Sequence, residues 1–292
     1  MPVFDTPDPI LATIELSVGA VRVVASDRSD TTVHVRPGDR SDFRDVVTAA
    51  AAVVDYADGE LTVSVANPRG LPHGGGTVTV DIEVPTGSSV HGDALAADFH
   101  CEGRTGECRI TTDCGHLHFA RTGPLYLSSL LGNVTVERVF GDVEAVTECG
   151  DVRIDTIDGT VRLSRTRGAT YLGEVGGALH VSAHSGDLHI GRAHVAVEAR
   201  TTQGDIRIDE VVRGPLALET VSGALEIGIA DGVGARLDLD SHSGTVYRSL
   251  ELLDALAARP TAADRAVEVH ARTATGDIVV RRAALDLDEG SP

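Results

Sequence analysis

Aspartates that directly follow glycines recur through the second half of the chain. They are Asp151, Asp187, Asp205 and Asp277. Calcium-binding β-rolls place carboxylates at a similar period, in G-G-x-G-x-D turns that surround each ion with oxygen ligands. Here the double glycine is missing from nearly every turn, and the equivalent positions also carry His116, Asn133 and Ala169. We therefore expect the aspartates to cap turns through hydrogen bonds to nearby backbone, rather than to bind calcium.

Histidines offer a second candidate site. His116 and His118 are two residues apart, so on a β-strand they would point to the same outer face, and His118 would stack above His100 of the preceding repeat. Three imidazoles within reach of one another could bind Zn²⁺ or Cu²⁺. Alternating polar residues are, however, ordinary on a solvated strand face. We expect no bound metal and no cofactor, with these three histidines as the candidates if a metal does bind.

Motifs of covalent catalysis are incomplete in this chain. The stretch "HGGG" at residues 73–76 is similar to the oxyanion-hole motif of esterases, but no G-x-S-x-G nucleophile turn accompanies it. The stretch "DSHSG" at residues 240–244 contains Asp, Ser and His, crowded into one corner where they cannot form a catalytic triad. We expect no catalytic residues and a protein that is not an enzyme.

The four cysteines form no C-x-x-C motif, so neither a redox pair nor a zinc ribbon is indicated. We expect Cys101 and Cys108 to point inward. Cys114 and Cys149 should occupy the same corner two repeats apart, about 10 Å by strand spacing and too far for a disulfide.

Glycines reveal the elements that carry these residues. One series recurs with a central period of 18 residues: Gly115, Gly132, Gly150, Gly168, Gly186, Gly204 and Gly223. A second series runs about nine residues out of phase: Gly106, Gly123, Gly141, Gly159 and Gly177. Each half-repeat reads G-x-apolar-x-apolar, which is typical of a short strand followed by a turn.

Stacked repeats would place equivalent side chains above one another at about 4.8 Å. One expected column is Phe119, Val136, Ile154, Leu172, Ile190, Ile208 and Ile227, and a facing column is Leu125, Val143, Val161, Leu179, Val197 and Leu216. Nearly every member is aliphatic. The sequence therefore predicts an all-β fold, a single-chain β-solenoid of about 18-residue coils.

The expected organisation has three parts. Residues 1–95 lack the 18-residue period and should form a β-rich N-terminal cap region, with a hairpin at Asp58-Gly59 and either a short helix or a loop near residues 43–54. Residues 96–282 should form the solenoid, interrupted by an insertion at about 249–266. Residues 283–292 should form an acidic disordered tail.

Charge and composition limit the possible partners. The net charge of −19 and the scattered basic residues argue against nucleic acid. Since no apolar stretch approaches the roughly 20 residues of a membrane span and no signal peptide is evident, we expect a cytoplasmic protein without membrane contact.

Several stretches resemble those of a bacterial family of β-strand repeats. They are "SGDLHIG", "TQGDIRIDEV", "VDYADGELTV" and "VEVHARTATGDIVVRR". They are similar to a family of unknown function whose members are called putative adhesins, especially the actinobacterial ones, over about residues 8–282. The resemblance implies a β-solenoid with no established catalytic residues.

Two functions agree with this reading. The first is a non-catalytic scaffold or adhesin-like module that binds protein partners. The alternative is a β-helix that binds or cleaves polysaccharide, which the absence of Trp disfavours because sugar sites usually stack on aromatic rings. Self-association could use the C-terminal repeats. Gly276 to Val280 should be the open last repeat there. The leucines of the insertion should either form an apolar contact surface or fold back onto the solenoid as a local cap; they are Leu250, Leu252, Leu253 and Leu256.

Overall fold

The computed structural model describes residues 2–65, 75–249 and 266–283, and nearly all of its regular structure is β-strand. The chain divides into two compact units. The first comprises Met1–Asp158 with Leu163–Arg165, and the second Gly159–Arg162 with Thr166–Pro292. Each unit is a stretch of β-solenoid, which confirms the fold class expected from the glycine period.

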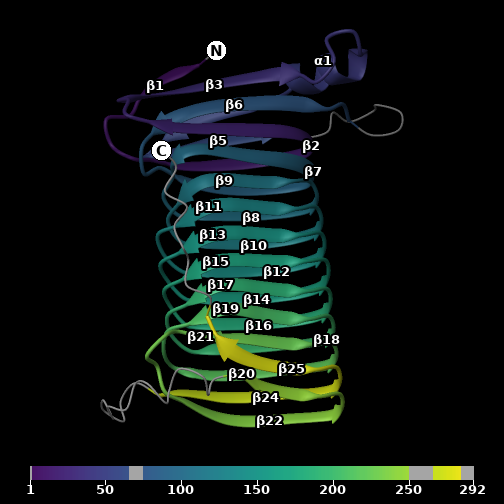
Figure 1. Ribbon diagram of the computed structural model, residues 1–292. Coiled ribbons are helices and arrows are strands. Elements are labelled where there is room, and N and C mark those ends of the chain that lie inside the picture. Colours follow the sequence, from purple (N-terminus) through teal and green to yellow (C-terminus); the bar gives the residue numbers. More distant parts are fainter. Residues whose placement is uncertain (1, 66–74, 250–265, 284–292) are drawn as a thin grey trace, which may run out of the picture. The chain divides into compact units, whose positions relative to one another are not determined.

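In the first unit, parallel strands stack in two series (Figure 1). One series is β8 (Cys108–Cys114), β10 (Leu125–Leu131) and β12 (Val143–Cys149). The other is β7 (Ser89–Arg104), β9 (Leu117–Thr122), β11 (Val134–Val139) and β13 (Val152–Ile157). Each strand pairs with the strand one repeat later in one-to-one register over most of its length. Two successive strands therefore make one turn of the solenoid, called a coil below.

The core of the first unit follows the expected columns. Phe119 lies beside Val136, and Val136 beside Ile154; on the facing sheet Leu125 lies beside Val143. All five side chains are buried. Because like residues stack at each position, the apolar face of each short strand is covered by its neighbours.

Glycine is required where the coils turn. Gly132 has φ of +144°, in the region that side chains rarely adopt, and a Cβ at this position would collide with the carbonyl oxygen of Gly115. The turns of neighbouring coils approach too closely for a side chain to fit between them.

Parallel pairing begins well before the expected boundary at residue 95, which falls inside β7. Strand β2 (Leu11–Ser26) runs beside β7 in parallel from Leu11 to Ala25, and its other edge pairs with β5 (Glu60–Val65) and β6 (Val78–Pro85). The long β2 therefore spans the width of a whole coil, and a Cβ on its Gly19, which is in register with Ala97, would collide with the carbonyl oxygen of Val78.

Antiparallel strands complete the N-terminal region. Strand β3 (Asp30–Pro37) pairs with β6, and β1 (Val3–Asp5) pairs with β3. Strand β4 (Val53–Ala57) forms the expected hairpin with β5, turning at Asp58 (φ +52°) and Gly59 (φ +82°). Of the two alternatives for residues 43–54, the helix is correct over α1 (Phe43–Ala50), whose N-cap Asp42 accepts a hydrogen bond from the Arg44 backbone N–H.

The second unit repeats this construction from β15 to β21, after which the order of the strands changes. Its strands are β15 (Thr170–Val175), β16 (Leu179–Ser185), β17 (Leu188–Ala193), β18 (Val197–Gln203), β19 (Ile206–Val211), β20 (Pro215–Ser222), β21 (Leu225–Ile229), β22 (Ala235–Ser243), β23 (Val246–Ser249), β24 (Val267–Thr275) and β25 (Ile278–Arg282). The expected columns Leu172–Ile190–Ile208–Ile227 and Leu179–Val197–Leu216 are in register and buried. The residues of β14 (Val161–Arg167) are divided between the two units.

The order of the last two coils differs from the order in sequence. Strand β24 pairs with β20 on one edge and β22 on the other (Figure 1). Strand β25 likewise pairs with β21 and β23. The expectation that Gly276 to Val280 is the last repeat is therefore wrong. The outermost described coil is β22–β23, where Leu237 and Leu239 are only half-buried because they are covered from one side.

Parts of the expected organisation lie outside the described residues. These are most of the insertion, with its four leucines, His73 of "HGGG", and the acidic tail beyond residue 283. Within the described ranges, no helix is long and apolar enough to cross a membrane.

Candidate functional site

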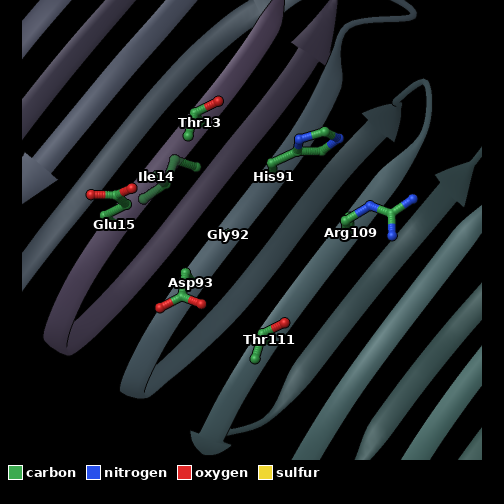
Figure 2. Close-up of a pocket in the computed structure, with 8 residues that line it drawn as sticks. All are labelled: Thr13, Ile14, Glu15, His91, Gly92, Asp93, Arg109 and Thr111. Atoms are coloured by element: carbon green, nitrogen blue, oxygen red, sulfur yellow. The ribbon is translucent and has the colours of Figure 1, made fainter.

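A shallow pocket of about 170 Å³ lies on the outer face of the first unit (Figure 2). Its lining residues are Thr13, Ile14 and Glu15 of β2, His91, Gly92 and Asp93 of β7, and Arg109 and Thr111 of β8. The register of the parallel strands places these residues in rows that cross the strands.

The first row is basic and the second is acidic. Thr13, His91 and Arg109 are directly opposite one another on neighbouring strands, and Glu15, Asp93 and Thr111 form the next row. Ile14 and Gly92 lie between the rows and face the core, where a Cβ on Gly92 would collide with the ring of Phe99. The floor of the pocket is therefore formed by backbone atoms, with the basic row on one side and the acidic row on the other.

Neighbouring groups orient the basic row. Glu107 Oε1 lies 3.5 Å from His91 Nε2 and 3.3 Å from Arg109 Nη2. The Arg109 guanidinium also lies over the ring of Tyr126, 4.3 Å from its centroid, which restrains the side chain. Thr13 Oγ1 donates a hydrogen bond of 2.9 Å to Glu60.

The acidic row contains two carboxylates on adjacent strands. Glu15 and Asp93 are directly opposite each other and both are exposed. Like charges opposite each other destabilise a sheet by a few tenths of a kcal/mol. A cationic group of a ligand would relieve this repulsion while an anionic group contacts Arg109, so the pocket suits a polar surface that carries both charges.

The predicted histidine cluster is only partly assembled. His100 and His118 are in register, and their rings stack with centroids 4.6 Å apart and planes 9° from parallel, as expected. His116 lies in the turn before β9, where its Nδ1 accepts a hydrogen bond from the Asn133 backbone N–H. Stacked rings do not direct their nitrogen atoms toward a common point. Across residues 2–65, 75–249 and 266–283, no group of three or more His, Cys, Asp or Glu side chains is arranged to hold a metal ion.

Three of the four aspartates that follow glycines cap a turn of the neighbouring coil rather than their own. Asp187 Oδ1 accepts the backbone N–H of Asp205 at 2.9 Å, and Asp205 Oδ1 accepts that of Ala224 at 2.7 Å. Asp277 does the same for Thr245, at 2.7 Å. These hydrogen bonds join successive coils and use an oxygen that a calcium ion would need.

The cysteines lie where the sequence places them. Cys101 and Cys108 are buried, and all four are free thiols. The adjacent Cys108 thiol, together with burial, raises the pKa of Cys101. Leu131 lies in register between Cys114 and Cys149, so these two thiols are two coils apart.

The pocket residues were not recognised from the sequence. Glu15, Asp93 and Arg109 belong to segments that are far apart in the chain and come together only through the pairing of β2 with β7 and of β7 with β8. A sequence signal was present, since each lies on the polar face of an alternating segment, but alternation does not say which strands are neighbours.

Coils of parallel strands with aliphatic columns inside and polar ladders outside define a β-solenoid with exposed polar faces. The chain belongs to the Toastrack DUF4097 family, whose model matches residues 12–281. None of the curated proteins matches it.

Solved structures similar to the chain include two from Bacteroidetes and one from Clostridium. A putative adhesin of Parabacteroides merdae has 16% sequence identity and a TM-score of 0.45, over 77% of this chain and 94% of that one. A putative adhesin of Bacteroides fragilis has 14% identity and a TM-score of 0.30, over 96% of each chain. A putative cell adhesion protein of Clostridium sporogenes has 9% identity and a TM-score of 0.22, over 96% and 98%.

Proposed function

We propose that this protein is a non-catalytic, adhesin-like interaction module whose outer strand faces bind a protein partner. The observation that carries the proposal is the pocket of the first unit, where a basic row and an acidic row face solvent side by side on paired strands. A protein surface with charged groups of both signs is the natural complement of such an arrangement.

The chemistry of the pocket favours binding over catalysis. Glu15 and Asp93 are exposed, whereas the acid of a carboxylate pair normally works from apolar surroundings that keep its proton in place. His91 and Arg109 contact Glu107 instead of a nucleophile. The groups present can bind and orient a charged surface without a bond-breaking step.

The alternative, a protein that binds or cleaves polysaccharide, rests on the carboxylate pair. Its weak point is the aromatic residue beside the pocket, because Tyr126, opposite Arg109 on the neighbouring strand, already lies under that guanidinium. Release of reducing ends from any of a panel of polysaccharides by the purified protein would establish this alternative and contradict the proposal.

Photo-cross-linking in the native cell tests the proposal. A benzophenone amino acid replaces Thr111 in the pocket or, as a control, Arg40, which is exposed in the turn before α1. We expect a protein adduct of discrete mass from position 111 after irradiation and none from position 40. If positions 111, 135 and 207, on three outward strand faces, all fail to yield a protein adduct, the proposal is wrong.

We also propose that the protein acts in the cytoplasm. All four cysteines are free thiols, which suits a reducing compartment. Fractionation of cells that express a tagged chain tests this, and recovery of most of the protein outside the cytoplasm would contradict it.

A further inference from the structure

Three arginines form a ladder on the outer face of the first unit. Arg104 at the end of β7 is opposite Arg121 of β9, and Arg121 is opposite Arg138 of β11. All three are exposed. Successive arginines are thus one strand spacing apart, about 4.8 Å. The set Arg104, Arg121 and Arg138 is called the arginine ladder below.

Such a ladder costs free energy unless counter-charges lie on it, because like charges directly opposite each other repel. Within the described residues, the structure shows one ion pair on the ladder, between Arg138 Nη2 and Asp158 Oδ1 at 2.9 Å. One of the three positive groups is therefore paired with a carboxylate, on a chain whose net charge is −19. The arginine ladder is therefore a positively charged surface on an acidic protein.

Phe140 holds two of the three side chains. The guanidinium carbon of Arg104 lies 4.9 Å from the centroid of its ring and that of Arg138 lies 5.0 Å from it. Contacts of this kind restrict the rotamers of both arginines, so less conformational entropy is lost when their N–H groups bind a ligand. Phe140 is itself 38% exposed and can contribute apolar area.

We propose that the arginine ladder is a docking site for an acidic α-helix of a protein partner. This proposal rests on the proposed function and specifies the chemistry of the partner. Side chains at positions i, i+3 or i+4, and i+7 of a helix lie on one face with neighbouring Cβ atoms about 5–6 Å apart. That spacing matches the ladder closely, whereas alternate side chains of an extended strand are about 6.6 Å apart.

Arginine suits carboxylates because its planar fork of N–H groups can bind both oxygens at once. Glutamates or aspartates along one helix face would each meet one guanidinium, and an apolar side chain beside them would contact Phe140. Interfaces are enriched in arginine and aromatic residues, which agrees with this composition.

Other polyanions fit less well. A nucleic acid or a long sulfated polysaccharide would extend beyond three arginines onto the acidic remainder of the chain and be repelled there. A sugar would also need an open aromatic face, and the ring of Phe140 already carries two guanidinium groups. A short acidic helix avoids both difficulties.

Binding of a defined probe to the whole protein tests the proposal. The probe is a dye-labelled helical peptide of about 20 residues with glutamate at every third or fourth position on one face, and its control carries glutamine there. We expect fluorescence anisotropy to show binding of the glutamate peptide, at least about tenfold weaker binding of the glutamine peptide, and loss of affinity between roughly 50 and 500 mM salt.

Matched variants locate the binding site. Arg121→Glu should weaken binding of the glutamate peptide by about tenfold or more, whereas Arg40→Glu, with the same change in charge, should alter it less than about twofold. Arg121→Gln provides a second variant if Arg121→Glu lowers the melting temperature, and we expect it to weaken binding severalfold.

Equal effects of the Arg121 and Arg40 variants, or no binding of the glutamate peptide, would overturn the proposal. So would tighter binding of heparin or single-stranded DNA, abolished by Arg121→Glu, since the ladder would then serve another class of polyanion. These outcomes are separate from the cross-linking test, because a protein adduct at position 111 can form even if the ladder binds nothing.

Discussion

His100 and His118 stack as parallel rings, 4.6 Å apart, on the outer face of the first unit. The stack ends in a chain of polar contacts, because His100 Nε2 lies 3.0 Å from Glu102 and Arg22 makes two hydrogen bonds of 3.0 Å to the same carboxylate. The contacts from His118 through His100 and Glu102 to Arg22 therefore join β9, β7 and β2 through side chains as well as through backbone.

Glu102 should make stability depend on pH in the acid range. The hydrogen bonds from Arg22 lower the pKa of Glu102 below its ordinary value, so its contribution is complete above about pH 4.3 and is lost as pH falls through the lowered value. We expect Glu102→Gln to reduce the loss of melting temperature between about pH 5 and pH 3. The effect should stay below about 1 kcal/mol, since both side chains are partly exposed.

Glu144→Gln is the control for this measurement, as Glu144 is exposed and has no ion pair in the described parts of the chain. If both variants reduce the loss of melting temperature at acid pH equally, the Arg22–Glu102 contact is not the cause of the pH dependence.

Gly132→Ala tests the close approach of the turns. A methyl group there would collide with Gly115 as well as strain the backbone, so we expect a loss of more than about 2 kcal/mol in urea denaturation. Gly59→Ala is the matched control: its φ is also positive, but nothing lies within 4 Å of the added atom. It should cost about 1 kcal/mol. A larger loss at Gly59 than at Gly132 would contradict this account of the coil corner.

Ile208→Asp tests the direction of the strand faces in the second unit. Ile208 is fully buried between Ile190 and Ile227, so a carboxylate there should cost about 3 kcal/mol or more. Arg207→Ala, one residue away, removes an exposed contact with Asp209 (2.7 Å) and should cost less than about 1 kcal/mol. Similar melting temperatures for the two variants would contradict the assignment of Ile208 to the buried face of the strand and Arg207 to the exposed face.

Arg165 is an exception among the polar residues of the core. It is 5% exposed, at a position where other repeats carry Thr147 and Thr201, and burial lowers its pKa while Asp151 opposes the shift. Since a buried charge is costly even when paired, Arg165→Thr should raise the free energy of unfolding by about 1 kcal/mol. A lower urea midpoint with an unchanged slope would show that the interactions of Arg165 outweigh the cost of burial.

The sequence predicted the columns because alternation and an 18-residue period fix both the face and the register of a coil. Ile190 and Ile208 needed no further information. The same pattern could not place β24, since local alternation is identical whether that strand pairs with β20 or only with β22.

The outer sites were hidden for a related reason. The stretches Arg104-Thr105-Gly106 and Arg121-Thr122-Gly123 share the pattern R-T-G, which could have revealed two members of the ladder, but Arg138 is followed by Val139 and Phe140. The pairing of β2 with β7, which creates the pocket, lies outside the glycine period altogether.

The last coils of the solenoid pair in an order that differs from their order in the sequence, and paired cysteines measure this order directly. Ala217 of β20 is opposite His270 of β24, which is opposite Asp238 of β22, and all three are exposed. In-register neighbours are about 4.8 Å apart, within the range of a disulfide, and residues two coils apart are about 10 Å apart, beyond it. Under mild oxidation, mapped by mass spectrometry, we expect a disulfide in Ala217→Cys/His270→Cys and none in Ala217→Cys/Asp238→Cys. A disulfide in the second variant but not in the first would show that the coils follow the order of the sequence and would contradict the account.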